Sequence, residues 1–108
     1  MVSVTHTNSL EVSPVPYISA EARERLDPCI QELADEIERL ANAEGGDAAF
    51  AGFLNYSCTK LALKVMPVWR YWSIATVIGV FRNVADEFYR RVGVPYEDEK
   101  LAEHGDVY

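Results

Sequence analysis

Three stretches of the chain repeat their apolar residues with the period of an α-helix, and this limits the fold more than any other feature. In the first stretch the repeat is carried by Leu26, Ile30, Leu33, Ile37 and Leu40. These intervals of three and four residues place the side chains on one face of a helix. We expect a short helical turn at about 20–26, capped by Ser19, and a main helix at about 28–43. Asp27-Pro28 separates them, because the residue before proline disfavours helical geometry.

A second helix is predicted at about 48–65, with Asp47 as its cap, between Gly45-Gly46 and Pro67. A third helix is predicted from about Tyr71 to Val92, and it is apolar nearly all round in its first half. Such a helix lies in a core or at an interface between subunits.

Gly79 stands in the middle of this third helix, where glycine costs about 1 kcal/mol relative to alanine. Close approach of another helix would explain the glycine. Gly93 and Pro95 are expected to end the third helix, and a short helix at about 96–104 follows.

The sequence therefore predicts an all-α fold, a small helical bundle of three main helices plus a short C-terminal helix. Residues 17–108 are expected to form a single helical domain, and residues 1–16 an extended or flexible N-terminal arm, since Pro14 and Pro16 exclude a helix there. A domain of 108 residues has a modest core. We therefore expect a homo-oligomer that forms through the apolar helix near 71–81.

The charge of the chain is unevenly distributed. Residues 1–47 carry ten acids and three bases, residues 48–94 two acids and six bases, and residues 95–108 five acids and one base. The net charge of −7 argues against a nucleic-acid partner. Two alternatives account for the basic middle: the acidic ends fold back on it, or it faces an anion.

We expect no signal peptide, and the longest runs without charge are 48–59 and 71–81, the second between Arg70 and Arg82. Both are far shorter than the roughly 20 residues of a membrane span, so no membrane partner is expected. Cys29 and Cys58 have no metal-binding spacing and are expected to be buried free thiols. These features favour a cytoplasmic protein.

Basic and aromatic residues near the end of the third helix form the candidate site. Arginine binds phosphate or carboxylate with two parallel hydrogen bonds, and tyrosine rings can stack on a base. Arg90 and Arg91 are about 100° apart on a helix, so one anion would need a second chain to meet both. The alternative is that they complement the helix dipole and pair with Glu87, Glu97 or Asp98. The candidate ligand-binding residues are Asn55, Tyr71, Arg82, Glu87, Arg90, Arg91, Tyr96 and Lys100.

Glu32, Asp35 and Glu36 could hold a divalent ion together with Asp86 or Glu87, as paired acidic helices do in all-helical nucleotide pyrophosphohydrolases. The chain lacks the tighter acidic pattern of those enzymes. We therefore predict no metal site, no cofactor and no catalytic residue, and expect these acids to form a solvated face.

Several short motifs add a resemblance: LNY at 54–56, IGV at 78–80, EFYRRV at 87–92, PYED at 95–98 and GDVY at 105–108, with Tyr71 and Lys100. Over residues 17–108 the chain resembles a family of small uncharacterised proteins found in phage and bacterial genomes. His104, Arg82 and Ala85 depart from that family's pattern, which has Asn, Glu and Lys there. The resemblance implies a phage-linked setting, which would place the protein in the cytoplasm of the bacterial host, and no assigned activity.

Three functional hypotheses follow. The first is a non-catalytic homo-oligomer that binds an anionic, nucleotide-like small molecule and counters host defence signalling. The second is an adaptor or inhibitor that binds a host protein through the acidic ends of the chain. The third is a metal-dependent nucleotide pyrophosphohydrolase.

Overall fold

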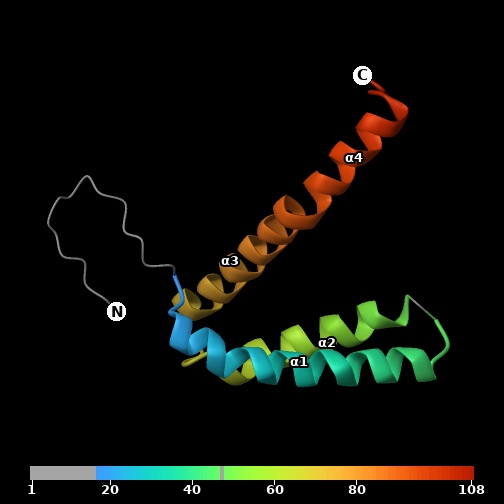
Figure 1. Ribbon diagram of the computed structural model, residues 1–108. Helices are drawn as coiled ribbons and strands as arrows, with labels where there is room; N and C mark the ends of the chain where they lie inside the picture. The colour runs from blue at the N-terminus through green and yellow to red at the C-terminus, as the bar shows by residue number, and fades with distance from the viewer. Residues whose placement is uncertain (1–16, 47) are drawn as a thin grey trace, which may run out of the picture. The chain divides into compact units, whose positions relative to one another are not determined.

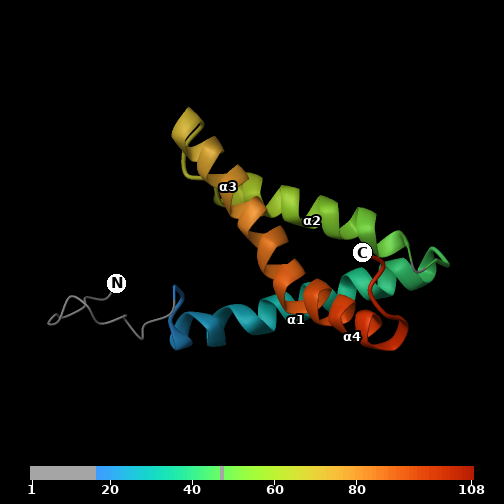
Figure 2. The same cartoon turned by 90° about the horizontal axis from the view of Figure 1, so that it is seen from above.

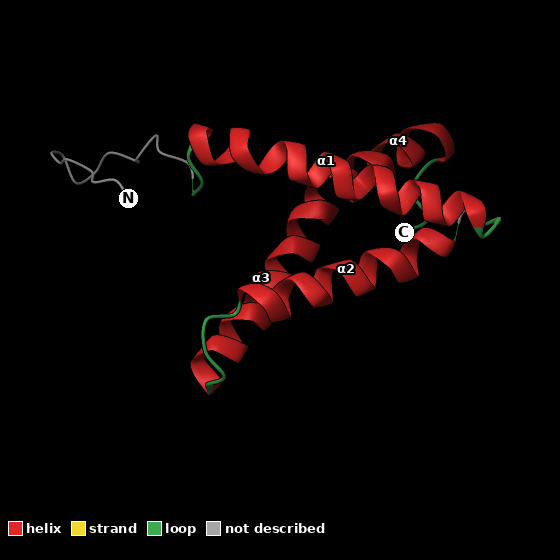
Figure 3. Ribbon diagram, turned by 90° about the horizontal axis from the view of Figure 1, so that it is seen from below, coloured by secondary structure: helices red, strands yellow, loops and turns green. Residues whose placement is uncertain are grey.

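The computed structural model describes residues 17–46 and 48–108 (Figure 1). The expected N-terminal arm at 1–16 and the cap at Asp47 lie outside the described residues. All regular structure in the described part is helical (Figure 3). It comprises α1 (Ala20–Ala43), α2 (Ala49–Val65), α3 (Tyr71–Phe88), the π-helical turn η1 (Tyr89–Gly93) and α4 (Val94–His104). The all-α prediction, with three main helices and a short C-terminal one, is confirmed.

The chain divides into two compact units, one ending at Tyr56 and one beginning at Ser57, and α2 contributes to both. The expectation of a single domain over 17–108 stays a prediction. No helix in the described residues is long and apolar enough to cross a membrane.

In the first unit, α1 is one continuous helix with Pro28 inside it, so the predicted break at Asp27-Pro28 is wrong. Ser19 caps its start, since the Ser19 Oγ accepts a hydrogen bond from the Ala22 N–H at 3.1 Å. Proline removes one backbone hydrogen bond, and the 24-residue helix continues through it because most neighbouring residues are good helix formers. Cys29 is exposed on this helix rather than buried as expected.

The turn after α1 follows the sequence prediction. Gly45 has φ of +81°, which favours glycine, and its N–H donates to the Asn42 carbonyl at 3.1 Å. α1 and the first half of α2 run in opposite directions on the two sides of this turn (Figure 2). They border an open hollow of about 330 Å³, lined by Ala34, Ile37, Glu38, Ala41, Asn42, Gly46, Phe50 and Leu54.

In the second unit, the end of α2 and the start of α3 border an open hollow of about 320 Å³ with almost entirely apolar walls. Its lining consists of Thr59, Ala62, Leu63, Met66, Trp69, Ile74, Val77, Ile78 and Phe81. α3 begins after Arg70, whose carbonyl accepts hydrogen bonds from the Ser73 and Ile74 N–H groups at 3.0 Å each. The apolar stripe predicted for the third helix therefore faces α2 within this unit.

The chain passes from α3 to α4 through η1 with no loop (Figure 1), so the predicted helix end at Gly93 and Pro95 is wrong. Gly93 has helical φ and ψ of −66° and −48°, and the Val94 N–H donates to the Tyr89 carbonyl five residues earlier. In an α-helix the Pro95 ring would clash with the carbonyl four residues before it. The wider π turn relieves that clash, and the helix changes direction here when seen from above (Figure 2).

Most large apolar side chains of the described residues are exposed. Among the hydrophobic residues of that part only Ala41 is buried, whereas Trp72 is 57% and Phe88 66% exposed. Burial of apolar surface is the main source of folding free energy. Each unit by itself therefore buries little of its apolar surface.

Candidate functional site

The end of α3 and the turn η1 carry a cluster of charged side chains centred on Glu87. Arg90 donates to one oxygen of the Glu87 carboxylate and Arg91 to the other. The pairing of Glu87 with arginine is as the sequence predicted. The expectation that Arg90 and Arg91 point to different places is wrong, because long side chains three and four residues after Glu87 both reach back to it.

This cluster is open to water. The Glu87 side chain is 42% exposed, and those of Arg90 and Arg91 are 67% and 76% exposed. The hydrogen bond from Arg91, together with the nearby charge of both guanidinium groups, lowers the pKa of Glu87. Glu87 is thus a carboxylate at neutral pH, and it occupies the donors that an external anion would use.

Next to this cluster Tyr89 forms a clasp across η1. Its hydroxyl donates to the Glu97 carboxylate at 2.6 Å, and this hydrogen bond raises the pKa of the Tyr89 phenol. Its ring lies over Gly93, where a Cβ atom would come within 2.5 Å of the ring Cδ1 atom. Gly93 is therefore needed for the close approach of the Tyr89 ring rather than for a left-handed conformation.

Tyr96 and Lys100 form a separate pair on α4. The Lys100 Nζ lies 5.5 Å from the centre of the Tyr96 ring, within the range of a cation–π interaction. Lys100 also pairs with Glu103 at 3.4 Å. These two candidate residues therefore lie together on α4, and the Glu103 carboxylate already takes up part of the Lys100 charge.

Tyr71 and Arg82 do not join these clusters within the second unit. Tyr71 and Arg82 lie on the same side of α3 but are eleven residues, or about 16 Å, apart along the axis. Arg82 is exposed and has no ion pair among the described residues. Asn55 is exposed on α2 and belongs to the first unit.

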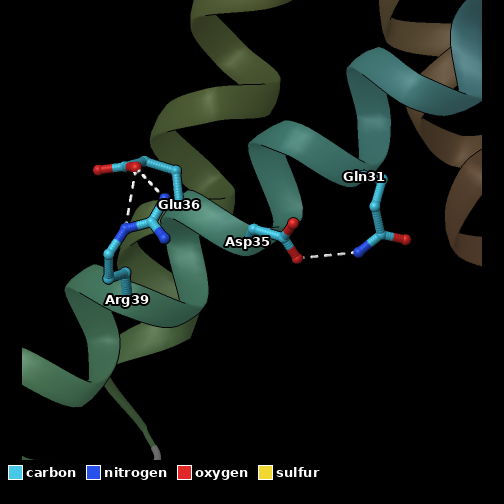
Figure 4. Close-up of polar contacts among 4 residues, drawn as sticks. All are labelled: Gln31, Asp35, Glu36 and Arg39. Carbon is cyan, nitrogen blue, oxygen red and sulfur yellow. Dashed lines mark hydrogen bonds and ion pairs between the residues drawn. The ribbon is translucent and has the colours of Figure 1, made fainter.

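Two of the three candidate acids of α1, Asp35 and Glu36, contact neighbours on the same helix (Figure 4). Gln31 donates to Asp35 at 2.9 Å, and the Arg39 Nε donates to Glu36 at 3.2 Å. In the described residues no three histidine, cysteine or acidic side chains come together as metal ligands. Asp35 and Glu36 therefore form exposed contacts within α1, and the hydrolase hypothesis stays a prediction.

Gly93 and Glu97 are the site residues that the sequence reasoning missed. Glu97 was considered only as a partner for arginine, and Gly93 only as a helix end. The available signal was the aromatic residue four positions before a glycine, with an acid four positions after it. Pro95 concealed the pattern because it suggested that no helix connects Tyr89 to Glu97.

Comparison with known proteins adds a family without an assigned activity. A family model described as Domain of unknown function (DUF6899) matches residues 15–107. No curated protein and no solved structure matches the chain significantly. The expectation of an uncharacterised family is confirmed, while its motifs and its phage-linked setting stay predictions.

Proposed function

The chain belongs to the family described as Domain of unknown function (DUF6899), and on that premise we propose that it is a non-catalytic, homo-oligomeric protein that binds an anionic, nucleotide-like small molecule. The observation that carries the proposal is the convergence of Arg90 and Arg91 on one exposed carboxylate. Two guanidinium groups that can hold a carboxylate together can also hold a phosphate. The ligand displaces Glu87 and takes over both sets of donors.

Exchange of Glu87 for a ligand is physically reasonable because the present pairs are exposed. Solvent-exposed ion pairs contribute little to stability, so they are readily replaced by a group of higher charge. A phosphate carries more negative charge than one carboxylate and offers three acceptor oxygens. A nucleotide-like host signal is the ligand class that fits the phage-linked setting of the resemblance.

The homo-oligomeric part of the proposal is supported by the exposed apolar residues of α3. Tyr71, Trp72, Ile78 and Val80 are 85%, 57%, 48% and 52% exposed. An exposed apolar surface of this kind marks a site of protein association. The same surfaces also favour the second candidate, an adaptor that binds a host protein, with α4 carboxylates such as Asp98 and Glu99 available for a basic partner.

The binding test uses thermal-shift measurements with inorganic phosphate, nucleotides and cyclic nucleotides. Native protein should be stabilised by at least one phosphate compound, and Glu87→Gln should bind it more tightly because the competing carboxylate is gone. Glu103→Gln is the matched control, since it removes an exposed carboxylate that pairs with Lys100 outside the cluster. Equal binding by both variants and the native chain, or no binding at all, would reject the anion site.

The assembly test is light scattering across a range of protein concentrations. The proposal requires a mass above the 12.1 kDa of one chain. A single chain at every concentration would refute the homo-oligomer. Recovery of a host protein that depends on residues 95–108 would instead support the adaptor hypothesis.

A further inference from the structure

The two arginines that hold Glu87 belong to the turn η1, whereas Glu87 itself lies on α3. The directions of the Arg90 and Arg91 side chains therefore follow the backbone of η1. This backbone is π-helical, since the Val94 N–H donates to the Tyr89 carbonyl five residues earlier. π turns inside α-helices are rare and frequently lie at functional sites. The geometry of η1 thus decides whether both guanidinium groups meet the same anion.

The backbone hydrogen bonding of η1 is incomplete. Pro95 follows Val94 directly and has no N–H, so the hydrogen bond that would come after the one from Val94 is not formed. A segment that lacks part of its backbone hydrogen bonding opens more readily than a complete one. Side-chain contacts across the turn therefore determine how rigidly η1 holds Arg90 and Arg91.

The Tyr89 clasp is such a contact. Tyr89 is the first residue of η1, and its ring lies over Gly93, the last residue of η1, so closely that a Cβ atom there would come within 2.5 Å of the ring. The Tyr89 hydroxyl donates to Glu97 on α4 at 2.6 Å. The clasp therefore joins residues on both sides of the two arginines, and all of these residues lie in the unit that begins at Ser57.

From this geometry we infer that Tyr89 and Glu97 are positioning residues, whose clasp holds η1 in the conformation in which Arg90 and Arg91 reach one anion together. The inference rests on the anion site of the proposed function and adds two residues that control this site without touching the ligand. Donors that are already held in place bind more tightly, because less conformational freedom is lost when the ligand binds. By thermodynamic linkage, a bound anion stabilises the clasp to the same extent.

Glu87 reports on this arrangement without any added ligand, since it is the anion that both arginines hold in the structure. The hydrogen bond from Arg91 and the nearby charge of both guanidinium groups lower the pKa of Glu87. If η1 loosens, these interactions weaken and the pKa of Glu87 rises toward its ordinary value of 4.5. Tyr89→Phe removes only the hydroxyl and should cause this rise, measured by NMR titration of the side-chain carboxyl carbons. Tyr108→Phe is the matched control, because it removes a phenol hydroxyl beyond the end of α4.

Substitutions at Glu97 separate positioning from charge. Glu97→Gln keeps an oxygen that accepts from the Tyr89 hydroxyl, so the pKa of Glu87 should stay low. Glu97→Ala removes the acceptor and should raise the pKa of Glu87, whereas the loss of a neighbouring negative charge by itself would lower that pKa. Glu97→Ala should add little to the effect of Tyr89→Phe, because both substitutions break the same hydrogen bond.

Phosphate binding provides the second measurement. Titration with inorganic phosphate, followed by phosphorus NMR, should show several-fold weaker binding by Tyr89→Phe and by Glu97→Ala than by native protein. Glu97→Gln should bind at least as tightly as native protein, and Tyr108→Phe should bind equally well. Far-ultraviolet circular dichroism under the same conditions verifies that each variant keeps its helices.

The outcomes separate this inference from the proposed function. If native protein binds phosphate, an unchanged Glu87 pKa or an unchanged phosphate affinity in Tyr89→Phe would overturn the positioning role and leave the anion site intact. If native protein binds no phosphate while the Glu87 pKa rises in Tyr89→Phe, the clasp positions the arginines and the anion site is refuted. An equal rise of the Glu87 pKa in Tyr108→Phe would indicate a general loosening of the fold and would also overturn the inference.

Discussion

Gly93→Ala is the most direct test of the clasp formed by Tyr89. The φ and ψ of Gly93 are helical, at −66° and −48°, so alanine fits the backbone and would ordinarily stabilise the helix by about 0.5–1 kcal/mol. Here the new Cβ would lie 2.5 Å from Cδ1, 2.9 Å from Cε1 and 3.3 Å from Cγ of the Tyr89 ring. The ring must turn away, and its hydroxyl then leaves Glu97.

We therefore expect Gly93→Ala to change the free energy of unfolding in opposite directions in two backgrounds. In the native chain Gly93→Ala should lower the free energy of unfolding, because the displaced ring and the lost hydrogen bond outweigh the gain in helix propensity. In a Tyr89→Ala chain the same substitution meets no ring and should raise the free energy of unfolding by about 0.5–1 kcal/mol. A two-state domain of this size would show this as a rise of roughly 4–8 °C in Tm per kcal/mol.

Urea denaturation followed by far-ultraviolet circular dichroism measures both effects, with all four chains at one protein concentration because assembly contributes to stability. The comparison forms a double-mutant cycle, so the coupling between positions 89 and 93 is read independently of each single effect. Stabilisation of equal size in both backgrounds would show that the ring does not lie on Gly93 and that the account of η1 is wrong.

Two further predictions concern charge. The pKa of Glu87 is lowered in the folded chain, so the Glu87 carboxylate stabilises the fold fully above the ordinary pKa of 4.5 and loses this effect as the pH falls through the lower pKa of the folded chain. The difference in free energy of unfolding between native protein and Glu87→Gln should therefore shrink from pH 7 to pH 3. The pKa of Tyr89 is raised in the folded chain, so the protonated Tyr89 phenol stabilises the fold fully below the ordinary pKa of 10.0 and loses this effect as the pH rises through the higher pKa of the folded chain. Ultraviolet difference absorbance at alkaline pH should show a late-titrating phenol that disappears in Tyr89→Phe.

The sequence predicts most of the helices because apolar periodicity is a property of the chain itself. The turn at Gly45 was also predictable, since a helix that ends before two glycines commonly continues into a left-handed residue. The two errors in helix boundaries both concern proline. Pro28 removes one backbone hydrogen bond inside a long helix, and Pro95 follows a π turn whose wider backbone leaves room for the proline ring. Neither proline therefore ends a helix.

The site was harder to predict because its contacts depend on that π turn. Tyr89 and Glu97 are eight residues apart, which is about 2.2 turns of an α-helix and would leave them on different sides. The π turn contains one residue more than an α-helical turn, and the other seven residues of the interval correspond to almost two full α-helical turns. This local change in geometry, which no periodicity in the sequence reveals, brings the Tyr89 hydroxyl to Glu97.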